Sequence, residues 1–142
     1  MKPTAVILDD SSTTRAALRL MLGRAGFDVV AEGVSGDQAL SLYESHRPTV
    51  ITIDIVLPGL DGVSAATELL RLHPDATVVM CSSISARDKI LACRDAGATH
   101  FILKPITWDK VEAVSRVVMA RAARLGLDGT ARDKDGETRV AS

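Results

Sequence analysis

Residues 50–62 read VITIDIVLPGLDG, and this stretch predicts more about the fold than any other. Its first four residues form a short β-branched, apolar run, which is typical of a strand buried on both faces. The run ends at Asp54, and the loop after it holds a Pro-Gly pair, which favours a turn. We therefore predict a buried strand that ends in a carboxylate and leads through a turn-rich loop into a helix over 64–72.

The same strand–helix unit recurs four more times along the chain. Each further strand is predicted from an apolar run, and each is followed by a segment with helical periodicity. Right-handed crossovers between such strands place helices on both faces of a sheet. The sequence therefore predicts an α/β fold, (βα)5, with one doubly wound sheet of five parallel strands. The other predicted strands are 5–8, 29–32, 77–81 and 99–103, and the other predicted helices are 12–22, 35–47, 85–96 and 107–124.

Several helix ends can be predicted from local chemistry. Ser12 is the expected N-cap of the first helix, and Gly23 and Gly26 are expected to end it. Ser35 and Gln38 have the spacing of a capping box at the start of the second helix. Each of these predictions concerns a specific backbone hydrogen bond or turn.

The composition is that of an ordinary globular domain. The 142 residues suit one domain, with 46% hydrophobic and 25% charged residues. The formal net charge of -1 gives no reason to expect attraction to nucleic acid or membrane, and 3% aromatic residues are too few for a base-stacking platform. No apolar stretch approaches the length of a membrane span or a signal-peptide core, so we expect a cytoplasmic protein.

The chain ends and the cysteines give two further expectations. We expect the folded domain to span 1–125 and to act without a second, DNA-binding domain, and we expect the polar segment 126–142 to be a flexible tail. Cys81 and Cys93 are too few for a disulfide framework and lack metal-ligand spacing. They are interpreted as buried, reduced thiols.

Side chains able to carry chemistry follow four of the five predicted strands. Asp9 and Asp10 follow the first strand, Asp54 the third, Ser82 the fourth and Lys104 the fifth. The carboxyl ends of parallel strands share one edge of the sheet, where open α/β folds bind their ligands. We therefore expect these five residues, distant in sequence, to converge.

This combination of groups favours phosphoryl transfer. Three carboxylates in one crevice repel each other unless a cation lies between them, and oxygen ligands suit a hard cation such as Mg²⁺. A lysine ammonium can reach a phosphate, and a carboxylate can itself accept the phosphoryl group. Singly, an Asp pair is more often a turn or cap, a Ser pair a helix N-cap and a Lys-Pro pair a loop. The prediction depends on their joint placement at strand ends.

The chain also resembles a known family over residues 2–124. Four segments carry the resemblance, namely VILDD at 6–10, TIDIVLPGLDG at 52–62, MCSS at 80–83 and FILKP at 101–105. They are similar to the receiver domain of bacterial two-component response regulators, and within that family to the single-domain chemotaxis (CheY-like) type. The resemblance implies a flavodoxin-like fold with strand order 2-1-3-4-5.

The resemblance also implies a role for each residue of the candidate site. Asp54 would accept the phosphoryl group, and Lys104 would pair with that group. Asp9 and Asp10 would hold Mg²⁺ together with Asp54 and the backbone carbonyl of Val56. The expected function is thus Mg²⁺-dependent phosphoryl acceptance, with no turnover beyond the protein's own phosphorylation and dephosphorylation.

The family's switch residues are implied in the same way. Ser82 would bind the phosphoryl group and move on activation, and Phe101 would turn inward with it. The phosphoryl group would favour the state in which the hydroxyl has moved in, so the switch would be a population shift. The output surface would be formed by the fourth helix, the fifth strand and the fifth helix. The Lys104–Pro105 bond is expected to be cis, an uncommon geometry elsewhere.

The sequence departs from the family pattern at several positions. Ser82 replaces a commoner Thr, Phe101 a commoner Tyr, and Ile106 the usual aromatic residue after Lys-Pro. Val56 and Ile84 lie two residues beyond the acceptor and the switch hydroxyl, where polar side chains can help to place an attacking water. Because both are apolar here, we expect slow self-dephosphorylation.

The remaining candidate residues have plainer interpretations. His46, His73 and His100 share no spacing and are interpreted as structural or exposed rather than as a base, a ligand or a phosphohistidine. Trp108 is interpreted as a packing residue rather than a partner contact.

The expected partners are a sensor histidine kinase or a histidine phosphotransfer protein, a downstream effector and, as a further candidate, a phosphatase. The protein would be a monomer or a weak dimer. A phosphorelay intermediate or phosphate sink would use the same residues and stays open, and a phosphorylation-independent scaffold is less favoured. A phosphohydrolase of the haloacid-dehalogenase type needs a second Asp two residues after the first, but Ser11 and Ser12 stand there.

Overall fold

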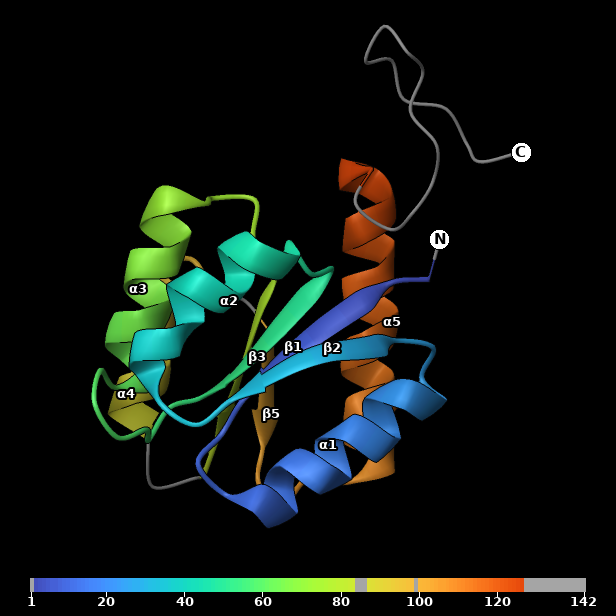
Figure 1. The fold of residues 1–142 in the computed structure, drawn as a ribbon, viewed down its shortest axis with the longest axis horizontal. Helices are drawn as coiled ribbons and strands as arrows, with labels where there is room; N and C mark the ends of the chain where they lie inside the picture. The colour runs from blue at the N-terminus through green and yellow to red at the C-terminus, as the bar shows by residue number, and fades with distance from the viewer. Residues whose placement is uncertain (1, 84–86, 99, 127–142) are drawn as a thin grey trace, which may run out of the picture.

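The computed structural model describes residues 2–83, 87–98 and 100–126. Its five strands form one parallel sheet in the order β2-β1-β3-β4-β5 (Figure 1). The doubly wound α/β fold and the predicted strand order are therefore confirmed. The strands are β1 (Thr4–Leu8), β2 (Asp28–Gly33), β3 (Val50–Asp54), β4 (Val78–Ser82) and β5 (His100–Leu103).

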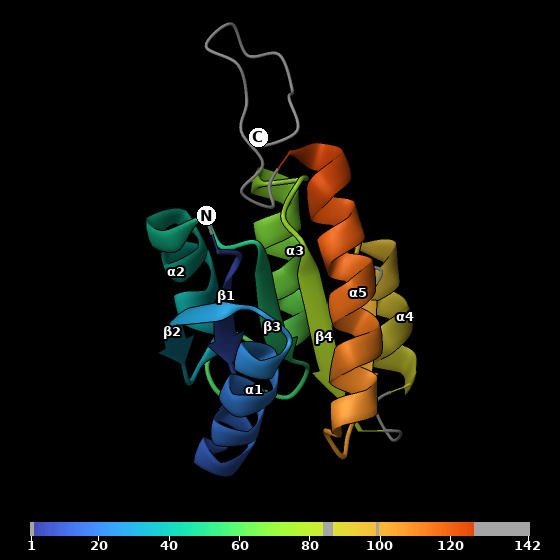
Figure 2. The same cartoon turned by 90° about the vertical axis from the view of Figure 1, so that its right-hand side faces the viewer.

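Helices cover both faces of this sheet. α1 and α5 lie on one face, and α2, α3 and α4 lie on the other (Figures 1 and 2). A short 3-10 turn, η1, precedes α2. Their bounds are α1 (Ser12–Arg24), η1 (Gly36–Gln38), α2 (Ala39–His46), α3 (Gly62–Leu72), α4 (Arg87–Asp95) and α5 (Trp108–Leu125).

The hydrophobic core consists of two layers, one on each side of the sheet. Alternate residues of a strand point to opposite faces, so neighbouring apolar residues of one strand enter different layers. Val50 packs on the α1/α5 side, whereas Ile51 and Ile53 pack on the side of α2, α3 and α4. Every residue of β3 and β4 is buried, as the continuous apolar runs predict.

The structure corrects two of the predicted helix ends and confirms two others. The N-cap of α1 is Ser11, whose Oγ accepts from the Thr14 backbone N–H at 3.3 Å, so the assignment to Ser12 was wrong by one residue. Gly23 does not end α1 but lies inside it. Ala25 still has right-handed helical angles, and the backbone departs from them at Gly26, where φ is +107°. Gln38 does fold back as in a capping box, since its Oε1 accepts from Ser35 N–H at 3.2 Å.

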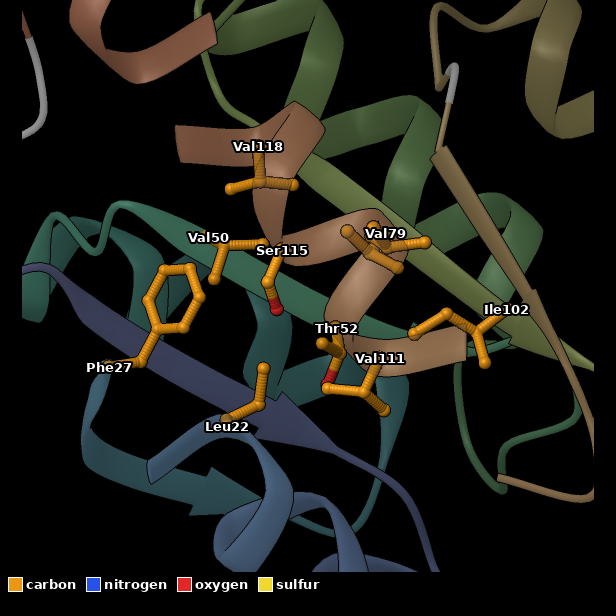
Figure 3. Close-up of a pocket in the computed structure, with 10 residues that line it drawn as sticks. Leu22, Phe27, Val50, Thr52, Val79, Ile102, Val111, Ser115 and Val118 are labelled. Atoms are coloured by element: carbon orange, nitrogen blue, oxygen red, sulfur yellow. The ribbon is translucent and has the colours of Figure 1, made fainter. Parts of the chain in front are cut away.

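A small void lies between the sheet and α5. Its volume is about 10 Å³, and its lining is apolar apart from Thr52 and Ser115 (Figure 3). The Thr52 hydroxyl is buried and has no hydrogen-bond partner among the described residues. A space this small is a packing defect and not a ligand site.

Some predictions fall on residues outside the described ranges. They include Ile84, the first residue of the predicted strand 99–103, and the segment 127–142 of the predicted tail. Within the described ranges, no helix combines the length and the apolar character that a membrane crossing requires.

Candidate functional site

The strand register brings the predicted residues to one edge of the sheet. Asp54 at the end of β3 pairs with Cys81, next to Ser82 at the end of β4. Asp9 and Lys104 directly follow β1 and β5. The order β1-β3-β4-β5 therefore sets the ends of these four strands in a row, as the sequence predicted.

Asp54 is a buried carboxylate with two contacts. Its Oδ2 accepts from Lys104 Nζ at 2.9 Å, and its Oδ1 accepts from the Val56 backbone N–H at 3.1 Å. Burial raises the pKa of Asp54, and the Asp9 charge raises it further, while the two hydrogen bonds and the Lys104 charge lower it. The net effect is upward, so the ionised form of Asp54 is disfavoured by its surroundings.

Asp9 is fully buried, and each of its polar groups has a partner. Its Oδ1 accepts from the Ser11 backbone N–H at 2.8 Å, and its Oδ2 accepts from Lys104 Nζ at 3.3 Å. Its backbone N–H donates to the Gly33 carbonyl at 3.1 Å, and its backbone carbonyl accepts from the Arg15 guanidinium at 2.7 Å. The turn that carries Asp9 and Asp10 is thus held from several sides.

Lys104 joins the two buried carboxylates. Burial by itself lowers the pKa of its ammonium, but the hydrogen bonds and charges of Asp54 and Asp9 together outweigh burial and raise the pKa. Lys104 is therefore charged at neutral pH. Its backbone N–H donates to the Ser82 carbonyl at 2.6 Å, and the bond to Pro105 is cis, as expected.

Three carboxylates at this edge can hold a metal ion. Asp9, Asp10 and Asp54 each offer an oxygen, and these oxygens lie within 4.8 Å of one another. Two of the residues are buried, while Asp10 is exposed, so the group opens to solvent on one side. An all-oxygen set that leaves room for water and phosphate oxygens fits Mg²⁺. The chemistry of the donors therefore agrees with the predicted cofactor, whereas the Val56 carbonyl as a ligand stays a prediction.

The predicted switch residues lie on the two strands that follow β3 in the sheet, with Ser82 at the end of β4 and Phe101 on β5. Ser82 is 1% exposed, and its Oγ has no hydrogen-bond partner among the residues that the structure describes. Phe101 is half-buried on β5 and borders a surface hollow with Ile90, Arg94 and Leu103. A buried hydroxyl without a partner is costly, so it is a natural place for a ligand contact.

Comparison with known proteins agrees with this geometry. Residues 5–116 match the model of the response regulator receiver domain. This chain belongs to that family. The receiver domain is 35% identical to the chemotaxis protein CheY of Bacillus subtilis, over 80% of this chain and 95% of that protein. It is 30% identical to CheY of Thermotoga maritima, over 82% of this chain and 98% of that protein.

The solved structures include similar receiver folds. A chain of the CheX–CheY–BeF3–Mg²⁺ complex from Borrelia burgdorferi superposes with a TM-score of 0.75 and 28% identity, covering 83% of this chain and 87% of that one.

Sequence reasoning missed two groups of residues that shape the receiver site. Arg15 reaches the Asp9 carbonyl and is itself bound by Glu32 of β2. Gly36 N–H donates to the Pro58 carbonyl at 3.3 Å, and Asp37 Oδ2 accepts from the Leu60 N–H at 3.4 Å. These contacts tie β2 and η1 to the loops that carry the acidic residues.

No motif could have predicted these contacts, because their targets are backbone groups brought close by the sheet.

The three histidines and Trp108, which the sequence analysis also singled out, differ in their surroundings. His73 contacts Glu44 at 2.9 Å and packs against Tyr43 with the two rings tilted by 40°, whereas His46 is exposed. The Arg24 guanidinium lies over the Trp108 ring, 4.1 Å from the ring centre. This contact supports the interpretation of Trp108 as a packing residue. His100 is half-buried, and burial, followed by the charges of two arginines, lowers its pKa.

Both cysteines are buried free thiols, as expected. Burial raises the pKa of Cys81 to about 12 and that of Cys93 to about 11. Neither thiol is therefore reactive at neutral pH.

Proposed function

We propose that this receiver domain accepts a phosphoryl group on Asp54 from a histidine kinase, with Mg²⁺, and acts as a stand-alone response regulator in the cytoplasm. The observation that carries the proposal is the Asp54 carboxylate itself. It is buried, touches Lys104, and lies with Asp9 and Asp10 in one cluster of carboxylate oxygens.

Each residue has a chemical task in this proposal. An oxygen of Asp54 forms the new bond to phosphorus while the phosphorus–nitrogen bond of the donor histidine breaks, and the donor imidazole takes up a proton. Mg²⁺, when bound by Asp9, Asp10 and Asp54, supplies neutralisation of the negative charge. The Lys104 ammonium is placed to pair with a phosphoryl oxygen, and the Ser82 hydroxyl is free to donate to another.

The signal would leave through the surface of α4, β5 and α5. Leu91 and Leu103 are 52% and 40% exposed there, and Phe101 lies between the core and this surface. Exposed apolar side chains favour a protein partner. A phosphoryl group bound by Ser82 would shift the population of this surface toward a state that binds the effector.

The names of the relatives favour a role like that in chemotaxis. The chain covers nearly the whole length of two CheY proteins, and a similar solved chain belongs to a complex that holds Mg²⁺. A phosphorelay intermediate would use the same residues. Rapid loss of the phosphoryl group to a histidine phosphotransfer protein would favour the relay, whereas phosphorylation-dependent binding of an effector would favour the chemotaxis-like role.

The first test is the intact mass of the protein after incubation with acetyl phosphate. The native chain should gain one phosphoryl group with Mg²⁺ and none with EDTA, and Asp54→Ala should gain none. Asp28→Ala, which removes an exposed carboxylate from β2, should behave like the native chain. A gain in Asp54→Ala, or none in the folded native chain with its own kinase present, would contradict the proposal.

A further inference from the structure

The Arg15 guanidinium reaches across from α1 to the backbone of the acidic turn. Its Nη1 donates to the Asp9 carbonyl at 2.7 Å, and its Nε donates to Glu32 Oε1 at 3.0 Å. We propose that Arg15 is a positioning residue for the metal site, which holds the Asp9–Asp10 turn in the geometry that binds the divalent cation. This inference rests on the proposed function, because it concerns the same cation.

The contact is well placed for this task. The side chain of Arg15 is only 19% exposed, and Glu32, which is 26% exposed, fixes it from β2. A guanidinium bound at two points keeps its direction better than a group bound at one. The Asp9 carbonyl belongs to the peptide that joins Asp9 to Asp10, and the Asp10 carboxylate is part of the metal cluster.

Loss of this contact should disturb the turn. Asp9 is fully buried, so its carbonyl would be left without water and without the Arg15 donor. A buried acceptor without a donor is unfavourable, and the backbone can relieve it by rotating the peptide that joins Asp9 to Asp10. That rotation would move both carboxylates. Changes at groups that orient metal ligands typically weaken metal binding by about 10- to 100-fold.

The charge of Arg15 predicts the opposite effect. A positive group near the cluster repels a divalent cation, so its removal alone would tighten Mg²⁺ binding. Loss of positioning and loss of charge therefore change the Mg²⁺ affinity in opposite directions. If positioning dominates, removal of Arg15 weakens Mg²⁺ binding, and if only its charge acts, removal strengthens it.

Arg19 offers a matched control one turn further along α1. It also binds Glu32, at 2.6 Å, but it is 51% exposed and does not contact Asp9 in the described structure. Arg19→Met removes the same charge and the same kind of ion pair while leaving the contact to the Asp9 carbonyl. Arg15→Lys keeps the charge but cannot reproduce the two-point contact.

The experiment is a calorimetric titration of Mg²⁺ into the full chain without any phosphoryl donor. We expect Arg15→Met to bind Mg²⁺ about tenfold more weakly, Arg15→Lys to be weakened as well, and Arg19→Met to match the native chain or bind slightly more tightly. Amide hydrogen exchange at Asp9, Asp10 and Ser11 should be faster in Arg15→Met and unchanged in Arg19→Met.

The outcomes separate the two proposals. If the native chain does not bind Mg²⁺, the proposed function fails. If the native chain binds it and Arg15→Met binds equally or more tightly, only the positioning role is overturned, and equal weakening in Arg15→Met and Arg19→Met overturns it too. If Arg15→Met does not fold, Arg15→Lys decides the question, because native-like Mg²⁺ binding in that variant contradicts the role.

Discussion

The Lys104 ammonium donates to the Asp54 carboxylate at 2.9 Å, although 50 positions separate the two residues in the chain. The contact bridges from the end of β5 to the end of β3. It lowers the pKa of Asp54, yet burial outweighs it, and the net shift of that pKa is upward. The receiver domain thus keeps a buried carboxylate whose ionised form is poorly stabilised without a further positive charge.

The first prediction is that Asp54→Asn stabilises the fold at neutral pH. Because the folded state raises the pKa of Asp54, it favours the protonated form. The stability from this protonation is fully present below the ordinary pKa of 3.8 and is lost as the pH rises through the raised pKa. In EDTA at pH 7, the melting temperature of Asp54→Asn should exceed that of the native chain, by roughly 2–4 °C for each kcal/mol gained.

This difference in melting temperature should shrink as the pH falls through the raised pKa, because the native Asp54 then becomes protonated. Asp28→Asn, at an exposed carboxylate of β2, serves as the control and should leave the melting temperature unchanged. A lower melting temperature for Asp54→Asn than for the native chain at pH 7 would show that Lys104 outweighs burial.

The second prediction compares two buried hydroxyls that have no partner among the described residues, Ser82 and Thr52. Replacing such a group by an apolar one removes an unsatisfied donor, so Ser82→Ala and Thr52→Val should keep or raise the free energy of unfolding, by up to about 1 kcal/mol. Denaturant unfolding measures this effect. Only Ser82→Ala should also slow phosphoryl acceptance, because Thr52 lies beside the void under α5 (Figure 3).

A strong loss of stability in either variant would mean that its hydroxyl has a partner in solution. Equal slowing of phosphorylation in both variants would mean that the effect on the site is indirect.

The third prediction concerns two glycines with opposite surroundings. A Cβ at Gly36 would lie 1.6 Å from the Leu60 carbonyl oxygen, which is backbone and cannot move aside without its loop. Gly36→Ala should therefore cost about 1–3 kcal/mol and displace the loop after Asp54. A Cβ at Gly23 would meet nothing within 4 Å, so Gly23→Ala should stabilise α1 by up to about 1 kcal/mol.

Chemical denaturation of the two variants checks this prediction, and the phosphorylation rate with acetyl phosphate should fall only in Gly36→Ala. A stable, fully active Gly36→Ala would show that the loop after Asp54 shifts freely.

The fourth prediction is a long lifetime of the phosphorylated state. The side chain of Val56 is 61% exposed two residues after Asp54, and as a hydrocarbon it cannot orient an attacking water. We expect decay over minutes or longer without a phosphatase, followed by intact mass. Val56→Asn should shorten the lifetime several-fold, whereas Val56→Ala should not. Loss of the phosphoryl group from the native chain within seconds would refute the prediction.

The sequence determined the pieces of this protein that depend on neighbours along the chain. Apolar runs predicted the five strands, because a strand buried on both faces carries apolar side chains on both faces. Their ends predicted where Asp9, Asp54, Ser82 and Lys104 would meet, because parallel strands bring their carboxyl ends to one edge. The N-cap of α1 was missed by one residue, since Ser11 and Ser12 offer the same hydroxyl.

The tertiary structure decided what depends on contacts between backbone groups and distant side chains. The Arg15 contact to the Asp9 carbonyl and the close approach of Gly36 to Leu60 involve no residue type that marks them in a sequence. The pKa of Asp54 also depends on the tertiary structure, because burial raises it and Lys104, 50 positions away in the chain, lowers it. The sequence by itself determined which groups meet at the edge of the sheet, and the packing around them decided how tightly each is held and how it is charged.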